Sequence, residues 1–177
     1  VSGGACAIRA NSTVDILEIK KAVSVPMIGI IKKIYPDSEV YITPTMAEVD
    51  ALAKTGAEVI SLDATNRLRP GGVTITELFR DVRKKYKDQL FMADCSTYEE
   101  GCLAEELGFD IVGTTLSGYT AETHGKELPD IPLVEKLCRD LKIPVIAEGG
   151  IWYPEVLARL FEIPGLHAAV VGTAITR

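Results

Sequence analysis

The sequence predicts an α/β fold, a (β/α)8 TIM barrel, and three observations lead to it. Seven apolar runs lack polar alternation, which is typical of parallel strands covered on both faces. Segments with helical periodicity separate these runs, and such alternation indicates right-handed crossovers in a parallel sheet. Almost every run ends at a polar or glycine residue, and barrel enzymes build their active sites at strand carboxyl ends.

The expected strands are residues 5–9, 26–31, 57–62, 89–93, 110–113, 144–147 and 168–171. A doubly wound sheet is the competing architecture, but it concentrates its chemistry at one switch point. A closed barrel needs eight strands, and whole barrels usually exceed about 200 residues. We therefore expect this chain of 177 residues to be a single barrel domain, residues 1–177, that lacks the first βα unit and the last helix.

Six helices are expected between the strands, and several have recognisable ends. Capping boxes are predicted at Thr45–Glu48, Thr74–Glu77 and Ser96–Glu99, and Gly108 is predicted to end the helix that follows Ser96–Glu99. Pro154 occupies a first helical position. Apolar periodicity alone predicts the remaining two helices, which contain Ile16, Ile19 and Val23 in one case and Leu133, Leu137 and Leu141 in the other.

Composition excludes several classes of protein. A formal charge of −6 argues against nucleic-acid binding, and the basic run at residues 83–85 is read as the solvated face of a helix. No apolar run is long enough to cross a membrane, and the first residues do not resemble a signal peptide. The four cysteines show no C-x-x-C spacing, which indicates a reducing cytoplasm and no structural metal.

Lys32 is the sharpest catalytic candidate. It follows the apolar strand 26–31, where we expect its stem to be desolvated at the barrel mouth. Desolvation disfavours the ammonium form and would make the amine usable as a base or as a Schiff-base nucleophile. The alternative is a lysine at a strand end whose stem lies along apolar surface while its amine stays in water; the adjacent Lys33 indicates that cations are tolerated there.

Carboxylates end three further strands. Glu148 precedes two glycines and is interpreted as a catalytic carboxylate, the alternative being a structural ion pair. Asp63 and Asp94 end neighbouring strands. One of them is expected to bind sugar hydroxyls and the other to fix a lysine or arginine, unless either caps its loop. Asn11 and Thr115 end their strands similarly and are counted among the expected substrate contacts.

Glycine turns after the last two strands suggest a phosphate site. Gly149-Gly150 and Gly172-Thr173 stand where barrels bind phosphate through backbone N–H groups, although tight turns explain glycine equally well. Arg9 and Arg177 are candidate clamps for an anionic substrate.

The polar loop at residues 116–125 is a candidate lid that would contribute Ser117 or Tyr119 to the ligand. His124 in the same loop is read as a surface residue, and no histidine spacing indicates a metal site.

At the strand ends the sequence resembles the N-acetylmannosamine-6-phosphate 2-epimerase family, phosphate-binding barrels of bacterial sialic-acid catabolism. The resemblance spans the chain. The segments that carry it are residues 7–11 (AIRAN), 29–33 (GIIKK), 40–45 (VYITPT), 62–65 (LDAT), 92–97 (MADCST), 113–120 (GTTLSGYT), 146–149 (IAEG) and 171–177 (VGTAITR).

The resemblance implies interconversion of N-acetylmannosamine 6-phosphate and N-acetylglucosamine 6-phosphate without cofactor or metal. It assigns the catalytic lysine to Lys32, the catalytic carboxylate to Glu148, and substrate contacts to Arg9, Asp94 and Arg177. The sequence leaves a homodimer open. It departs from the family in beginning after a Ser-Cys-Gln segment, in Gly150 where many members have arginine, and in Thr173 where they have glycine.

Two other functions compete with the epimerase. One is a different phosphate-binding barrel enzyme that forms a Schiff base at Lys32. The other is a catalytically inactive fragment that binds a phosphosugar.

Overall fold

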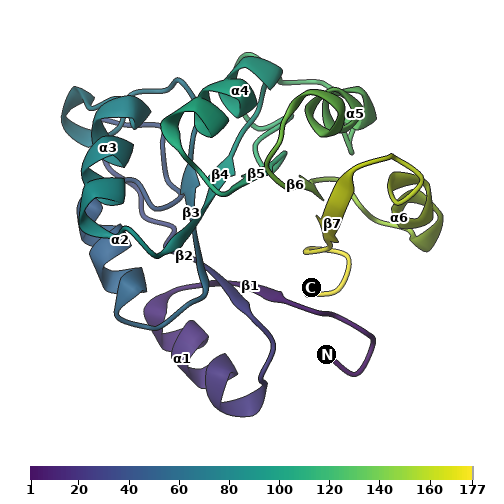
Figure 1. Ribbon diagram of the computed structural model, residues 1–177, viewed down its shortest axis with the longest axis horizontal. Helices are drawn as coiled ribbons and strands as arrows, with labels where there is room; N and C mark the ends of the chain where they lie inside the picture. Colours follow the sequence, from purple (N-terminus) through teal and green to yellow (C-terminus); the bar gives the residue numbers. More distant parts are fainter. Residues whose placement is uncertain (177) are drawn as a thin grey trace. The chain divides into compact units, whose positions relative to one another are not determined.

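A computed structural model describes residues 1–176 and shows strands and helices in strict alternation (Figure 1). The elements are β1 (Ile8–Asn11), α1 (Thr13–Ala22), β2 (Met27–Ile30), α2 (Met46–Ala53), β3 (Val59–Asp63), the 3-10 turn η1 (Pro70–Gly72), α3 (Ile75–Lys85), β4 (Leu90–Asp94), α4 (Tyr98–Leu107), β5 (Ile111–Gly113), α5 (Ile131–Asp140), β6 (Val145–Glu148), α6 (Pro154–Leu160) and β7 (Leu166–Val170).

The seven strands follow one another in chain order in one sheet. The pairs β1–β2, β2–β3, β5–β6 and β6–β7 are parallel. The α/β class and the alternation of seven strands with six α-helices are thus confirmed for the described residues. The chain divides into two compact units, Val1–Met92 and a second unit that begins at Ala93, so the division falls inside β4.

In the first unit, helices α1 and α2 pack closely on β2. Gly29 in β2 makes this possible, because an added Cβ would lie 3.0 Å from the Ile16 side chain and 3.1 Å from that of Leu52. Figure 1 shows α1, α2 and α3 on the same side of β1, β2 and β3. The fully buried side chains on this side of the unit include Ile16, Leu52, Phe79 and Phe91.

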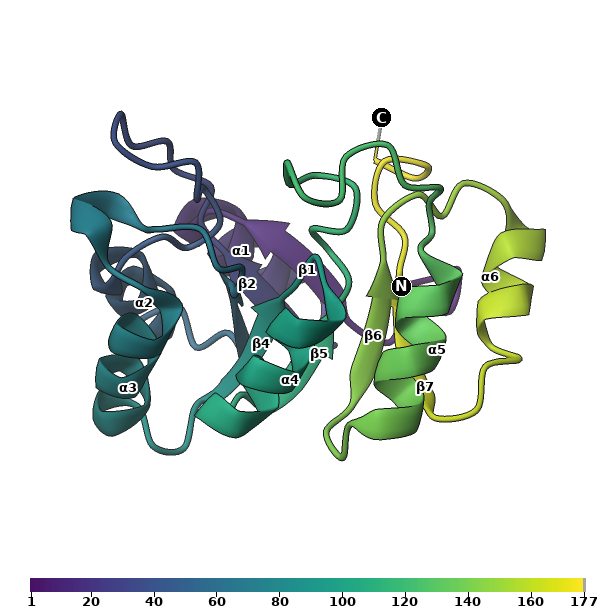
Figure 2. The same ribbon diagram turned by 90° about the horizontal axis from the view of Figure 1, so that it is seen from above.

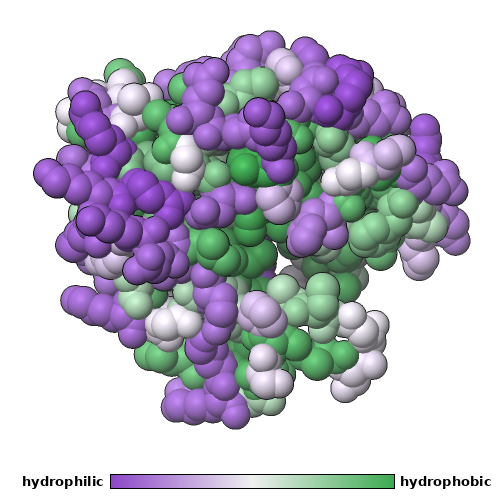
Figure 3. Space-filling model, in the orientation of Figure 1, coloured by the Kyte–Doolittle hydropathy of each residue, from purple (hydrophilic) through white to green (hydrophobic). Residues whose placement is uncertain are grey.

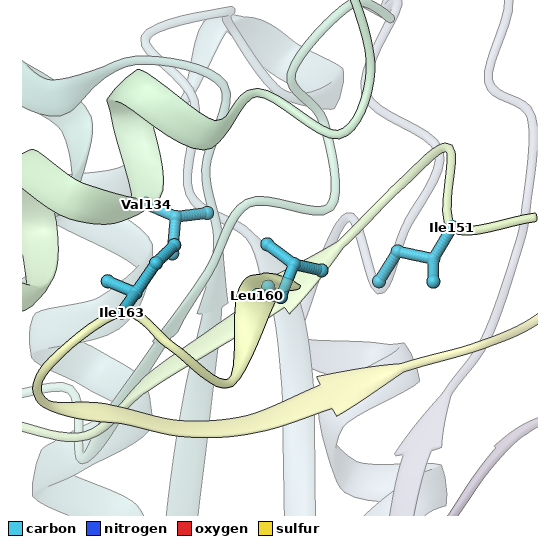
Figure 4. Packing of buried hydrophobic residues seen from close by; sticks show 5 residues of the cluster. Val134, Ile151, Leu160 and Ile163 are labelled. Carbon is cyan, nitrogen blue, oxygen red and sulfur yellow. The ribbon is translucent and has the colours of Figure 1, made fainter. Parts of the chain in front are cut away.

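In the second unit, α5 and α6 cover β6 and β7 (Figure 2). Their core contains Val134, Ala147, Ile151, Leu160 and Ile163, and Figure 4 shows the labelled side chains of this cluster gathered beside β6. The apolar run of β6 therefore serves the same purpose as that of β2: it provides the surface on which helices pack, and its last residue, Glu148, is left outside this core.

The predicted capping boxes at Thr45–Glu48 and Thr74–Glu77 are confirmed, but the third is displaced by one residue. Thr97, not Ser96, caps α4, and it pairs with Glu100 rather than with Glu99. Ser96 instead donates from its N–H and hydroxyl to the Glu100 carboxylate, at 2.7 and 2.8 Å. The reason is that the chain keeps pairing with β5 through the Cys95 N–H, so the turn to the helix comes one residue later.

Hydrophilic side chains lie along the outer sides of the helices (Figure 3). Lys84 and Lys85, in the basic run predicted to be solvated, are exposed. Within residues 1–176, none of the helices combines the length and the apolar composition that a membrane crossing requires.

Candidate active site

The predicted site residues are shared between the two units, and each group is described within its own unit. Lys32, in the first unit, lies two residues beyond the end of β2 and is exposed. The expected desolvation of its stem is therefore wrong for this structure. The physical reason is that the chain leaves the sheet after Ile30 and enters a hairpin-like excursion, in which Lys32 forms an antiparallel bridge with Ile42.

Hydrogen bonds fix the backbone around Lys32 on both sides. Its N–H donates to Asn11 Oδ1 at 2.7 Å. On the other side, the Lys33 N–H donates to the Tyr41 carbonyl at 2.9 Å and the Thr43 N–H to the Ile31 carbonyl at 2.8 Å. The side chain is thus exposed while its peptide is held firmly.

Lys33 is engaged in a different way from Lys32. Its amine lies 3.0 Å from the buried Glu48 carboxylate, which also accepts a hydrogen bond from the Tyr35 hydroxyl at 2.9 Å. Burial opposes ionisation of Glu48, but hydrogen bonds from Thr45, Lys33 and Tyr35 outweigh it and lower its pKa. The same contacts with Tyr35 and Glu48 raise the pKa of Lys33. Lys33 therefore has a structural role in the hairpin-like excursion that follows β2.

Asp63 is completely buried at the end of β3, and its carboxylate is used within its own loop. One oxygen accepts from the Thr65 N–H at 3.0 Å and the Thr65 hydroxyl at 2.6 Å, while the other lies 2.6 Å from Arg67. Burial raises the pKa of Asp63, although the arginines and hydrogen bonds oppose this shift. Of the roles considered for the two aspartates, this geometry favours arginine fixation and loop capping for Asp63.

Arg69 and Arg9, in the same unit, also make contacts near the strand ends. The buried Arg69 donates to the Asp63 carbonyl, and burial lowers its pKa to about 10. Arg9, on β1, donates to the Ser61 hydroxyl on β3 at 3.1 Å. This contact with β3 orients Arg9, the expected substrate clamp.

In the second unit, one hydroxyl links two of the predicted site carboxylates. Thr115 Oγ1 lies 2.7 Å from Asp94 Oδ1 and 3.0 Å from Glu148 Oε2. A hydroxyl has one proton to donate, so it bonds one carboxylate strongly at a time. The structure therefore brings together three residues that the sequence predicted separately, at the ends of β4, β5 and β6.

Thr114 is a site residue to which the sequence analysis assigned no role. Its hydroxyl accepts from the Glu148 N–H and donates to the Glu148 carbonyl, both at 3.0 Å. Thr114 thus holds the backbone of Glu148, while Thr115 bonds its carboxylate. The sequence shows a Thr-Thr pair directly after a strand, which could have indicated a site. Only the pairing of β5 with β6 shows that both hydroxyls contact Glu148.

The predicted glycine turns offer backbone donors. Gly149 and Gly150 have φ values of 103° and 70°, which favour glycine. Among residues 1–176, the N–H groups of Gly149, Gly150, Gly172 and Thr173 donate no hydrogen bond. Arg177, the second predicted clamp, lies outside the described residues.

We expect Gly150→Ala to lower the free energy of unfolding by about 2–4 kcal/mol, because it adds both overpacking and backbone strain. The new Cβ would lie 2.3 Å from Leu128 Cβ and 2.8 Å from the Leu128 carbonyl carbon. Gly125→Ala is the matched control, since Gly125 has a φ of 84° but open space around it. Urea denaturation measures both variants, and equal losses would show that crowding by Leu128 is unimportant.

The loop after β5 does not have the lid character that we expected. Ser117 is fully buried and donates to Asp130 at 2.8 Å. The expectation that Ser117 contacts a ligand is therefore not met in this structure. Bonds from the Gly118 N–H to Thr123 and from Thr120 to Ser96 tie the loop down further. Tyr119 is 59% exposed, and His124 is exposed, as its reading as a surface residue predicted.

Parallel strands that end in carboxylates and hydroxyls, with helices covering their outer side, define an α/β enzyme with a TIM-barrel-like fold. The model of the family described as "Putative N-acetylmannosamine-6-phosphate epimerase" matches residues 1–177. The chain belongs to this family.

Curated relatives and a solved structure agree with the family match. Two relatives carry the name "Putative N-acetylmannosamine-6-phosphate 2-epimerase". One, from Caldanaerobacter subterraneus, is 53% identical and aligns over 99% of this chain and 73% of its own length. The other, from Clostridioides difficile, is 52% identical over 100% and 78%. The structure of the N-acetylmannosamine-6-phosphate 2-epimerase from Clostridium perfringens is 52% identical, with a TM-score of 0.93 over 99% of this chain and 76% of that one.

Proposed function

We propose that this chain interconverts N-acetylmannosamine 6-phosphate and N-acetylglucosamine 6-phosphate by proton transfer at C2 of the sugar. The observation that carries the proposal is the likeness to the Clostridium perfringens epimerase, which extends over 99% of the chain in both sequence and fold. Inversion at C2 requires ring opening, loss of the proton beside the aldehyde, and its return from the other face. Side-chain acids and bases suffice for these steps.

In this proposal Lys32 exchanges the C2 proton. Its exposed amine extends from a backbone that Asn11 and Thr43 hold in place, which suits a group that must meet a reacting carbon. Arg9, oriented by Ser61, is assigned to the substrate, where a guanidinium can stabilise a developing oxyanion.

Glu148 is assigned to ring opening or to stabilisation of the developing charge. Support comes from its surroundings: Thr114 fixes its backbone, and the Thr115 hydroxyl lies within hydrogen-bond distance of its carboxylate and of that of Asp94. A carboxylate whose backbone is held by one hydroxyl and whose oxygen meets another is oriented before substrate arrives, which is a general requirement for efficient proton transfer. Asp94 is the aspartate left for the sugar hydroxyls, because Asp63 is committed to its own loop.

We assign the reaction to the cytoplasm. None of the four cysteines forms a disulfide within the described residues, which suits a reducing compartment.

Incorporation of solvent deuterium tests the proposal directly. In D₂O, NMR spectroscopy of the product should show deuterium at C2 of either sugar phosphate. Conversion without label at C2 would contradict proton exchange with solvent through a side chain.

The 6-phosphate should be required for efficient turnover. Four backbone N–H groups, at Gly149, Gly150, Gly172 and Thr173, donate no hydrogen bond within residues 1–176 and are suited to an anion. We expect kcat/KM for unphosphorylated N-acetylmannosamine to be lower by about 100-fold or more, since remote binding energy supports turnover. Thr173→Ala keeps the N–H and should keep the preference. Comparable rates on the two sugars would mean that the turns are only structural.

A further inference from the structure

The hydrogen bond from the Lys32 N–H to the Asn11 side chain replaces a missing rung of the β1–β2 ladder. The register pairs Asn11 with Ile30, and the Ser12 N–H donates to the Ile30 carbonyl at 3.0 Å. In a regular parallel pair, the Lys32 N–H would next donate to the carbonyl of Ser12. The Asn11 side-chain oxygen accepts this hydrogen bond instead, at 2.7 Å.

Backbone strain explains why a side chain takes over. Ser12 has φ 79° and ψ 147°, a conformation that residues other than glycine rarely adopt. At this residue the chain turns away from β2, so the Ser12 carbonyl does not accept from the Lys32 N–H. The turn lets Ser12 cap α1 by accepting from the Asp15 N–H at 3.1 Å. The early start of α1 thus removes a backbone acceptor, and Asn11 supplies another.

A second strained residue lies on the opposite side of the same segment. Thr43 has a φ of 46°, and within residues 1–176 only Ser12 and Thr43 combine a side chain with positive φ. The Thr43 hydroxyl accepts from the Ile31 N–H at 3.3 Å, and its own N–H donates to the Ile31 carbonyl. Strained residues persist where the surroundings over-determine them, and they cluster at functional sites. Here both flank the peptide that carries Lys32.

We propose that Asn11 is a positioning residue for Lys32, which goes beyond the expected substrate contact and rests on the proposed catalytic role of Lys32. Asn11 Oδ1 fixes the peptide from which the amine extends. A reacting group displaced by about 1 Å can lose about 100-fold in rate. Loss of this acceptor should therefore lower kcat much more than it changes KM.

Two variants separate the acceptor from the rest of the side chain. Asn11→Leu keeps the approximate size and removes the acceptor, whereas Asn11→Asp keeps an oxygen that accepts the Lys32 N–H and removes the amide donor. The Lys32 amide should exchange with D₂O about tenfold faster in the leucine variant, and at nearly the native rate in the aspartate variant. NMR-detected hydrogen exchange measures this without any assay of activity. Asn66→Leu, at an exposed loop asparagine, is the matched control and should leave exchange at Lys32 unchanged.

The kinetic arm uses N-acetylmannosamine 6-phosphate at saturating concentration. Positioning predicts a lower kcat with little change in KM for the leucine variant, and partial rescue by aspartate. A substrate contact made by the amide NH₂ predicts a raised KM in both variants and no rescue, which would overturn the proposal. Unchanged protection of the Lys32 amide in the leucine variant would overturn it too, even if that variant unfolds more easily. Native protein without epimerase activity but with the predicted exchange pattern would refute the proposed function and leave the contact established.

Discussion

Replacing Lys32 by alanine is expected to lower turnover by about 10²- to 10⁴-fold, the usual contribution of a general acid or base. Substrate affinity should stay within about tenfold, because a proton-transfer group acts mainly on the transition state. Steady-state kinetics and calorimetric titration with N-acetylmannosamine 6-phosphate measure the two quantities. The exposed amine makes few contacts that folding needs, so the variant should fold normally.

Lys33→Ala is the matched control for this prediction. It removes the same charge one residue away, where the amine bonds Glu48 rather than extending freely. Its turnover should stay near the native value, with a small loss of stability. Near-normal turnover of the Lys32 variant would end its assignment as the base. Borohydride in the presence of substrate should trap no adduct on the native enzyme, since deprotonation needs no imine.

The second large effect is expected from Glu148→Gln, which should also reduce turnover by about 10²- to 10⁴-fold. Glutamine keeps the shape and can still accept from the Thr115 hydroxyl, but it loses the negative charge and the ability to transfer a proton. The substitution therefore separates chemistry from packing. Rates with ring-closed and open-chain substrate indicate the step at which Glu148 acts, and equal losses on both forms would exclude ring opening as its role.

Glu155→Gln provides the comparison for the Glu148 variant. Glu155 is an exposed residue in the first turn of α6, in the same unit. Its variant should retain native turnover and a native melting temperature. A large loss there would indicate that net charge, rather than the group at the end of β6, controls the rate.

The periodicity of the sequence was sufficient to predict seven strands, but β1 lies at Ile8–Asn11 rather than at residues 5–9, and β7 at Leu166–Val170 rather than at 168–171. Local signals also predicted the helix starts at Thr45, Thr74 and Pro154. The apolar residues of β2 and β6 are buried. Burial selects apolar side chains, so such strands can be recognised from the sequence itself. The caps at Thr45 and Thr74 are also local, because both partners lie within one turn of the helix. Predictions of this kind depend on short-range contacts alone.

Properties that depend on distant segments were not predictable. The third cap moved from Ser96 to Thr97 because Cys95 pairs with β5. The exposure of Lys32 depends on where the excursion folds back to Ile42. The use of Asp63 within its own loop depends on where the loop carries Arg67. In each case the residue type indicated polar chemistry, and the partner was decided by the tertiary structure.

Leu128 restricts which substitutions this chain can tolerate in two separate segments. An added Cβ at Gly150 would lie 2.3 Å from it, and one at Gly118 would lie 3.0 Å from it. Substitutions in the loop after β5 and in the turn after β6 are therefore not independent: a side chain at position 150 is tolerated only after the segment around residue 128 has shifted. A variant of this chain with a larger residue at position 150 should need compensating changes near residue 128, and attempts to redesign the turn for another anion should mutate both segments together.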